Sequence, residues 1–533
     1  MKIKIAIACL CSMLSVAYVN AQQNFDIHIL PSSITNAPAI HSGAFAVHNG
    51  KWIFLGGRID GLHIMQANQA FGTYGRNDSI FVVDPIANTR LAASVSQLPS
   101  IMYEALGSSN MQSFQDGNHL YMVGGYGKAD STGIYTTFPS LISIDLDSII
   151  SKVTSASPIN SCFRQLLDTN LAVSGGELEK IDSTYYLTFG HYFEGTYAET
   201  PAIGTFVQRY THQIRKFNID DDGVNLSISN YAVLQDTDVY HRRDYNLVPQ
   251  IFPNGEFGLT AFGGVFQKNA NQPFLSPIDI TATNVQLQSA FNENLNQYTT
   301  STLPLYDSLN NYMHTVFFGG MSLYTMDTAT STLVQDTLVP FVQTISKVTR
   351  DNVGGLTEYL MSEPMPGFLG TNSFFIADSA VRYLPGGILD LNSISGNQRV
   401  GFIVGGIKSD APNVGHLDPA GMSRPNAIVY DVFVDKTNSD VAEIQVNNNI
   451  NNLIVYPNPV SKILNIDFSV PASTQCEVSL YSLKGKMVKA IMNDHLQKGP
   501  KHISFSVEGM KSGIYLCEIS TPIAKKVVKI IVE

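Results

Sequence analysis

The chain alternates short apolar runs with glycine-containing polar turns over most of its length. In five segments, a polar turn is followed by about five or six β-branched or aromatic residues and then by a Gly-Gly pair. These segments are 48–61, 116–127, 253–267, 309–322 and 396–409. A sixth segment, 182–195, follows the same pattern but carries Gly190-His191 in place of the pair. The pairs recur at intervals of roughly 55 to 85 residues, which indicates a repeated β-sheet unit.

Most repeats continue with a second apolar strand that ends near an aspartate. Such strands are found at 79–85, 141–147, 214–220, 276–282 and 428–434. One small sheet cannot bury both of its faces alone, so units of this kind stack against one another around an axis. We expect the glycine-ended strands to be the inner strands near this axis, where glycine permits a sharp turn with positive φ.

Residues from about 40 to 436 resemble the kelch β-propeller family. The turn, the apolar strand, the Gly-Gly pair and the later aspartate-containing strand are present, but the usual tryptophan is not: Trp52 is the single tryptophan and lies inside a strand. The resemblance implies an all-β, kelch-like β-propeller of six blades. Seven is the alternative, because 321–395 is long enough to hold a degenerate repeat. We expect the strand at 24–30 to complete the last blade and leave no open edge.

The pattern changes after residue 440. Residues 441–452 include an asparagine-rich polar run without apolar periodicity, which indicates a linker. Residues 453–533 then alternate apolar and polar positions in about seven short strands, which favours a small Ig-like β-sandwich.

This C-terminal module resembles the type A C-terminal sorting domain of the type IX secretion system. The resemblance rests on the YPNP stretch, the LYSLKGKMV hairpin, MKSGIYLCEI and the terminal KKVVKIIV. The motif residues are Tyr456, Pro457, Asn458, Pro459, Gly485, Gly513, Lys525 and Lys526. The resemblance implies a Bacteroidetes-type bacterium, recognition of the module by the outer-membrane translocon, and a secreted or surface-attached product. The lysines could form a recognition face or merely protect an edge strand.

The N-terminus predicts a signal peptide over residues 1–21. Lys2 and Lys4 precede an apolar run, and Val19-Asn20-Ala21 is a cleavage-type sequence, so Gln22 is expected to begin the mature chain. No other long apolar segment follows, so no membrane span is expected in the mature chain. The predicted organisation is therefore a signal peptide (1–21), a propeller (22–440), a linker (441–452) and a sorting domain (453–533).

Composition narrows the function classes. Charged residues make up 14% of the chain and the net charge is −11, so the basic surface that a nucleic-acid-binding protein needs is absent. Cys162, Cys476 and Cys517 remain after signal removal, and their spacing matches no zinc site. Cys476 and Cys517 are expected to point inward, either as a disulfide or as two buried thiols.

Two polar clusters in the propeller are candidate binding sites. His191 and Glu194 lie in the HYFEG stretch, and Arg242, Arg243 and Asp244 lie in YHRRDYN. The arginines and the aspartate could hold a carboxylate or sugar hydroxyls. The structural alternatives are a polar connecting loop for the first cluster and an ion pair within a blade for the second. The acidic segment 218–226 lacks the spacing of a calcium loop and is expected to be a solvated turn.

The sequence favours a secreted or surface-attached binding protein for glycan or protein, without metal or cofactor. The alternative is an extracellular carbohydrate-active or oxidoreductase-type kelch enzyme, and a third class is a structural surface component. No catalytic residue is identified. The axial mouth of the propeller discriminates between the first two classes. Convergent carboxylates or histidines with perturbed pKa values favour an enzyme, and a flat, neutral, aromatic mouth favours binding.

Overall fold

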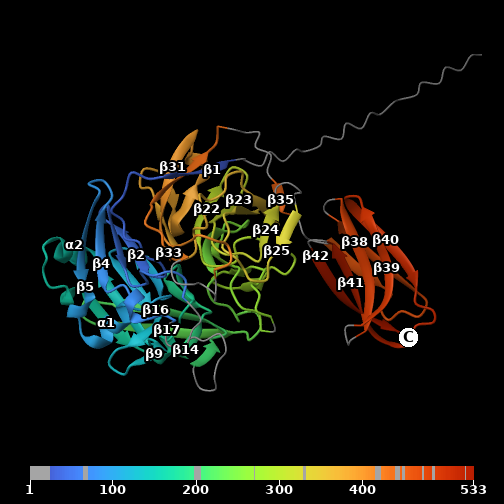
Figure 1. Cartoon of the computed structure of the whole chain (residues 1–533), viewed down its shortest axis with the longest axis horizontal. Helices are drawn as coiled ribbons and strands as arrows, with labels where there is room; N and C mark the ends of the chain where they lie inside the picture. The colour runs from blue at the N-terminus through green and yellow to red at the C-terminus, as the bar shows by residue number, and fades with distance from the viewer. Residues whose placement is uncertain are drawn as a thin grey trace, which may run out of the picture.

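The computed structural model describes most of the chain after the predicted signal peptide. The residues described are 25–533 except 64–69, 197–205, 269, 328–331, 415–421, 438–443, 447–450, 471–472, 483–485 and 522–523. The predicted signal peptide itself, 1–21, lies outside the described residues. The described part is almost entirely β-structure, with two short α-helices, α1 (Ser100–Leu106) and α2 (Leu146–Thr154), in the N-terminal half (Figure 1).

Six antiparallel sheets form the blades of a propeller, and the chain builds the first three in sequence order. Blade 1 contains β2 (Ala44–His48), β3 (Lys51–Leu55), β4 (Ser79–Asp84) and β5 (Thr89–Ser94). Blade 2 contains β6 (Gln112–Asp116), β7 (His119–Val123), β10 (Ser140–Asp145) and β11 (Phe163–Leu167). Blade 3 contains β12 (Glu177–Ile181), β13 (Thr184–Thr188), β16 (Gln213–Asp221) and β17 (Leu226–Gln235).

The last three blades follow the same plan. Blade 4 contains β18 (Asn246–Ile251), β19 (Phe257–Phe262), β20 (Ile278–Ile280) and β21 (Val285–Leu287). Blade 5 contains β22 (Ser301–Asp307), β23 (Tyr312–Phe318), β26 (Ile345–Arg350) and β27 (Leu356–Leu360). Blade 6 contains β28 (Ser373–Ala377), β31 (Asn397–Gly405), β34 (Tyr430–Asp435) and β1 (Asp26–Pro31).

The N-terminal strand β1 closes the ring. It pairs antiparallel with β34 as the outermost strand of blade 6, so the prediction that this segment completes the last blade is confirmed. Apolar cores fill the spaces between neighbouring blades. One contains Trp52 and Phe54 of blade 1 with Phe402 and Val404 of blade 6. The described residues form no seventh blade, because those of 321–395 are divided among blades 5 and 6 and smaller strands.

The radial order of the strands differs from the expectation. The glycine-ended strands β3, β7, β13, β19, β23 and β31 are the second strands of their blades, and the innermost strands are the segments just before them. The second strands are largely buried, as Leu120 and Val123 of β7 illustrate, whereas innermost strands such as β6 and β12 carry half-buried polar residues. A continuous apolar run therefore does not mark the strand nearest the axis.

The glycine pair connects each blade to the next. Both residues of each pair have positive φ, and in blade 3 Phe189 takes the first position with φ 46°. The amide of the second residue donates to a backbone carbonyl of the segment that leads into the following blade. These bonds are Gly57 to Ser108 (2.8 Å), Gly125 to Val173 (2.8 Å), Gly190 to Arg242 (2.9 Å), Gly264 to Gln297 (2.7 Å), Gly320 to Leu369 (2.8 Å) and Gly406 to Ile40 (2.9 Å).

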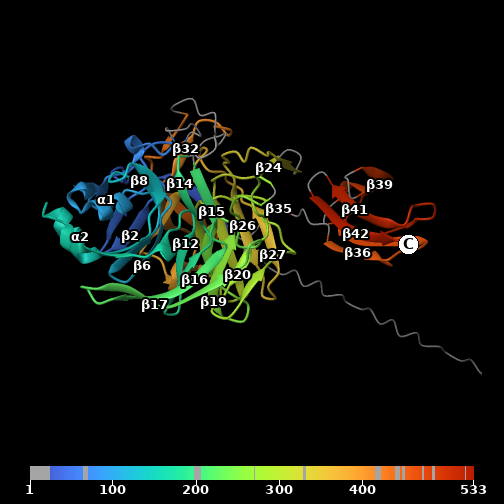
Figure 2. The same ribbon diagram turned by 90° about the horizontal axis from the view of Figure 1, so that it is seen from below.

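Further strands extend the loops between the second and third strands. β8 (Tyr126–Ala129), β9 (Ile134–Thr137), β14 (His191–Gly195) and β15 (Phe206–Tyr210) form one sheet from blades 2 and 3. Hairpins are formed by β24 (Tyr324–Asp327) with β25 (Thr332–Gln335), and by β32 (Ile407–Ser409) with β33 (Ser423–Pro425). Figure 2 shows β8, β14, β24 and β32 along one end of the propeller.

Blade 5 carries additional strands on both edges. β29 (Tyr383–Leu384) and β30 (Ile388–Asp390) extend the sheet next to β22, and β35 (Ile444–Val446) pairs with β27 on the other side. β35 lies inside 441–452, so the segment predicted as a linker contributes a strand to the propeller.

The C-terminal module is a two-layer β-sandwich. One sheet contains β36 (Asn451–Tyr456), β37 (Ile463–Val470) and β40 (Gly499–Ser506). The other contains β38 (Thr474–Ser482), β39 (Met487–Leu496), β41 (Gly513–Thr521) and β42 (Ala524–Val532). Cys476 and Cys517 are free thiols buried in the core between the sheets, together with Leu464 and Ile519.

A glycine substitution tests the contact between blades. A Cβ on Gly319 would lie 2.1 Å from the Leu369 carbonyl oxygen, whereas a Cβ on Gly117, at a similar positive φ, would meet nothing within 4 Å. Gly117→Ala should cost about 1–2 kcal/mol, since only the left-handed conformation is penalised. Gly319→Ala should cost at least about 2 kcal/mol more, measured by chemical denaturation. Equal losses in the two variants would contradict the proposed role of the contact.

Candidate functional site

A residue one or two positions before each innermost strand belongs to a ring around the propeller axis. Its backbone amide donates to the carbonyl of the equivalent residue of the preceding blade. The bonds are Asn110 to Ser42 (2.9 Å), Gly175 to Asn110 (3.0 Å), Asp244 to Gly175 (2.8 Å), Thr299 to Asp244 (3.2 Å) and Asn372 to Thr299 (2.9 Å). The side-chain amide of Asn372 closes the ring on the Ser42 hydroxyl at 2.8 Å. We call this set of six residues the axial ring.

The axial ring explains why small polar residues recur at these positions. Ser42, Asn110, Gly175, Asp244 and Asn372 have φ between 52° and 64°. Glycine, asparagine and aspartate tolerate this left-handed conformation better than apolar residues do. The backbone requirement therefore places polar groups at the axis of the propeller.

A cavity of about 260 Å³ lies at the axial ring and is lined by all six blades. We call it the axial pocket. Many of its lining groups are uncharged amides and hydroxyls. They include Asn110, Asn246, Thr299, Thr300, Thr302 and Asn372. The side chain of Asn246 is fixed by the Tyr298 carbonyl at 3.0 Å and by the Thr300 amide at 2.8 Å.

Carboxyl groups form the wall of the axial pocket on blades 3 and 4. Glu177 and Glu179 lie two residues apart on β12 and so project from the same face, and Asp244 belongs to the axial ring. Burial raises the pKa of Glu177 to about 8, and the carboxyls of Glu179 and Asp244 act in the same direction. Burial also raises the pKa of Glu179 to about 8. Burial raises the pKa of Asp244, although the adjacent Arg243 opposes this effect.

An aromatic pair forms the opposite wall. Phe45 of blade 1 and Phe374 of blade 6 line the axial pocket, with ring centroids 5.3 Å apart. In a ring of six blades, blade 6 lies across the axis from blade 3, and blade 1 lies across from blade 4. The axial pocket is therefore amphipathic, with aromatic rings facing carboxyl groups.

The long loops between second and third strands surround the same end of the axis, because each begins directly after a glycine pair. The loop of blade 1 contacts that of blade 6 through the Leu62 amide and the Ser423 hydroxyl, 2.9 Å apart. It contacts blade 2 through the rings of Phe71 and Tyr126, with centroids 5.1 Å apart. These contacts join the described parts of neighbouring loops at this end of the propeller.

The three residues of the predicted Arg-Arg-Asp cluster have separate roles. Arg242 is buried and donates to the carbonyls of Gly263 (2.9 Å) and Ser276 (2.8 Å), so it holds loops of blade 4 together. Arg243 forms an ion pair with Asp244. Of these three residues, Asp244 lines the axial pocket.

The other predicted cluster does not line the axial pocket. His191 is buried at the start of β14, and its Nδ1 lies 2.7 Å from the side-chain amide of Gln208. Burial lowers the pKa of His191 well below its ordinary value, and Arg243 adds to this effect. Glu194 is exposed on β14 and accepts a hydrogen bond from the Tyr192 hydroxyl.

The two pocket glutamates were not identified from the sequence. The available signal is the Gly175-Gly176-Glu177-Leu178-Glu179 stretch, in which two acids alternate with a core leucine directly after a glycine pair. This stretch indicates acidic groups at the axis only if β12 is known to be the innermost strand of its blade.

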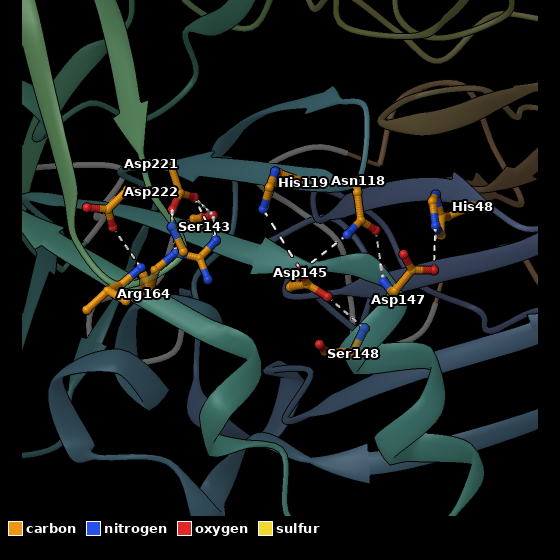
Figure 3. A network of polar contacts seen from close by, with 12 residues as sticks. His48, Asn118, His119, Ser143, Asp145, Asp147, Ser148, Arg164, Asp221 and Asp222 are labelled. Carbon is orange, nitrogen blue, oxygen red and sulfur yellow. Dashed lines mark hydrogen bonds and ion pairs between the residues drawn. The ribbon is translucent and has the colours of Figure 1, made fainter.

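The acidic segment 218–226 has a structural role at a contact between blades. Asp221 is buried and pairs with Arg164 of blade 2, with Oδ1 2.6 Å from Nε. Asp222 accepts from the amides of Val224 (2.8 Å) and Asn225 (2.6 Å) in the turn. The expectation of a simple solvated turn is therefore wrong for Asp221. Figure 3 shows this ion pair and a hydrogen bond between His48 and Asp147, at 2.9 Å.

The sorting-motif residues occupy both sheets of the sandwich. The Tyr456 hydroxyl donates to Asp467 at 2.9 Å, and Asn458 accepts from the amide of Ile531 at 2.8 Å. The segment 456–459, which includes Pro457 and Pro459, is thus joined to the last strand. Gly513 begins β41, and Lys525 and Lys526 pair with Ser520 and Ile519. Gly485 lies outside the described residues.

No group of three or more histidine, cysteine or acidic side chains in the described part of the chain has the geometry of a metal site. No helix among those residues is long and apolar enough to cross a membrane.

Comparison with protein families identifies the C-terminal module. Residues 454–533 match the family described as "Secretion system C-terminal sorting domain". The chain carries a type IX secretion sorting domain. The protein is therefore secreted or displayed at the cell surface, as the sequence predicted.

Two solved structures that match most of the chain are only distantly similar to it. The comparison with curated proteins finds no significant match. A solved structure titled "Structure of YjhT" is 12% identical, with a TM-score of 0.43, and the match covers 78% of this chain and 100% of that one. A glycoside hydrolase family 43 arabinoxylan arabinofuranohydrolase from Bacillus subtilis is 10% identical, with a TM-score of 0.27, covering 94% and 93%. Likenesses at these scores carry no argument about function.

The pocket glutamates should make stability depend on pH. The folded-state pKa of each carboxyl lies above its unfolded value, so protonation stabilises the folded protein at low pH. This contribution is lost as the pH rises through about 8. Between about pH 5 and pH 8, the Glu177→Gln/Glu179→Gln variant should gain at least about 1 kcal/mol of unfolding free energy relative to the unsubstituted protein.

The measurement is denaturant unfolding across this pH range. Glu194→Gln is the matched control, because that side chain is exposed outside the axial pocket. If the difference in unfolding free energy between the double variant and the unsubstituted protein stayed constant from about pH 5 to about pH 8, the assignment of raised pKa values would be contradicted.

Proposed function

We propose that the protein is a surface-delivered carbohydrate-binding protein whose kelch-type propeller holds a glycan in the axial pocket. The observation that supports this proposal is the amphipathic pocket itself, with Phe45 and Phe374 facing the carboxyls of blades 3 and 4. A sugar ring has an apolar face formed by its C–H groups and a polar edge formed by its hydroxyls. The aromatic wall suits the first and the carboxyl wall suits the second.

The uncharged lining supports the same ligand class. The amide of Asn110 and the hydroxyls of Thr299 and Thr302 can both donate and accept hydrogen bonds, as sugar hydroxyls do. The cavity is small for a folded protein surface and suits one or two sugar units.

The mature domain organisation is part of the proposal. A signal peptide (1–21) would direct passage of the inner membrane of a Bacteroidetes-type bacterium. The sorting domain (453–533) would then engage the outer-membrane translocon, delivering the propeller (22–440). The matched family model over 454–533 supports the second step.

Glycan binding by the mature chain tests the proposal. Phe45 and Phe81 are both partly buried against the same apolar core, but of the two only Phe45 lines the axial pocket. On a glycan array followed by calorimetry, the unsubstituted protein should bind a defined oligosaccharide. Phe45→Ala should weaken that binding about tenfold, equivalent to about 1.4 kcal/mol, and Phe81→Ala should not. Absence of any glycan ligand, or equal losses in both variants, would refute the proposal.

Export is tested by truncation. Deleting 453–533 should leave the propeller in the periplasm of the producing bacterium, because the translocon would have no sorting domain to engage. Cell fractionation with an antibody against the propeller measures this outcome. Normal surface delivery of the truncated protein would contradict the role assigned to the module.

A second candidate is an extracellular enzyme acting on carbohydrate. The axial pocket combines the two features expected of these classes: Phe45 and Phe374 favour binding, and the convergence of carboxyl groups with raised pKa values favours an enzyme. The carboxyl groups are those of Glu177, Glu179 and Asp244, and a protonated carboxyl beside an ionised one can act in acid–base catalysis. Release of reducing ends that Glu177→Gln abolishes would favour this candidate. The oxidoreductase-type alternative has less support, because Cys162 is buried in the core between blades 1 and 2 and does not line the axial pocket.

A further inference from the structure

The described lining of the axial pocket contains acidic side chains but no basic ones. Three of its lining residues, Glu177, Glu179 and Asp244, carry carboxyl groups, and none of its described lining residues is a lysine, arginine or histidine. The adjacent guanidinium of Arg243 is paired with Asp244 and lies over the ring of Phe266, 5.4 Å from its centroid. The described lining therefore offers carboxyl groups that a cationic ligand can ionise, but no cation for an anionic ligand.

Neither glutamate has a cationic partner of its own in the part of the chain that the structure describes. No hydrogen bond or ion pair to the Glu177 carboxyl is found among the described residues, and Glu179 interacts with the backbone amide of Lys180. The titratable neighbours of Glu177 are Glu179 on the same strand, with Asp244 and Tyr245 from the segment leading into β18. Adjacent carboxyls in a partly desolvated site ionise together only if a cation joins them.

The opposite wall also suits a cation. Phe45 and Phe374 both line the same cavity, with ring centroids 5.3 Å apart. Aromatic rings attract ammonium groups, and more strongly where water is partly excluded. A ligand ammonium in this pocket would meet carboxyls on one side and aromatic rings on the other.

We propose that the axial pocket selects amine-bearing sugars and that Glu177 and Glu179 hold the ammonium group. This inference rests on the proposed carbohydrate-binding function. A neutral sugar would leave the carboxyls without a charge partner. A uronic acid would place its carboxylate beside three carboxyl groups, which costs free energy without a compensating cation.

Matched ligands test this selection on the full mature chain. The probes are β-1,4-linked glucosamine disaccharide, its N-acetylated counterpart and a galacturonic acid disaccharide, each measured by calorimetry at neutral pH. The amine-bearing disaccharide should bind at least about tenfold more tightly than the acetylated one, and the acidic one should not bind detectably. Binding of the amine should also release protons, because the ammonium converts raised-pKa carboxyls to their ionised form.

Substitutions of the two glutamates test whether these residues cause the preference for the amine-bearing disaccharide. Glu177→Gln and Glu179→Gln, made singly and together, should reduce the amine-to-acetyl affinity ratio towards one and abolish proton release. The exposed control Glu194→Gln should keep both. Equal affinity for the amine-bearing and acetylated disaccharides, or preference for the acidic one, would overturn the selection while leaving carbohydrate binding intact. Binding of none of the three, together with a negative glycan array, would overturn the proposed function itself.

Discussion

The structure depends on one backbone hydrogen bond repeated around the ring. In every blade, the amide after a residue with positive φ donates to the carbonyl of the segment that leads into the next blade. In blade 6 the acceptor is Ile40, so the last blade is joined to the first. The first glycine of a pair must lack a side chain in several blades, because the same carbonyl passes about 2 Å from where a Cβ would lie, as at Gly124 and Gly405.

This bond also determines the position of the candidate site. In five blades, the accepting carbonyl belongs to the residue two positions before the axial ring, as Ser108 precedes Asn110 and Val173 precedes Gly175. Fixing the carbonyl therefore fixes the ring residue and the first residues of the innermost strand. Glu177 and Glu179 face the axis because β12 starts at this anchored point. Ring closure and pocket construction are consequences of the same local geometry.

The sequence predicted the parts of the fold that local pattern controls. The glycine pairs located the second strand of each blade, the apolar strand at 24–30 supplied ring closure, and the alternation after residue 453 located the sandwich. Radial order was predicted wrongly, because the continuous apolar run marks the second strand, such as β7, whereas the innermost strand β6 is largely polar. The site was predicted only at Asp244. Arg242 was a candidate because of its charge, but its guanidinium donates to backbone carbonyls. Glu177 and Glu179 have the sequence pattern of ordinary surface acids.

The central claim is that the six glycine-pair amides close a single ring, and amide hydrogen exchange tests it most directly. Protection should be high at the amides of residues 57, 125, 190, 264, 320 and 406, and all six should become exchangeable in one cooperative opening. Rapid exchange at residue 406 alone, with the other five protected, would show that blade 6 is not joined to blade 1 and would contradict the account.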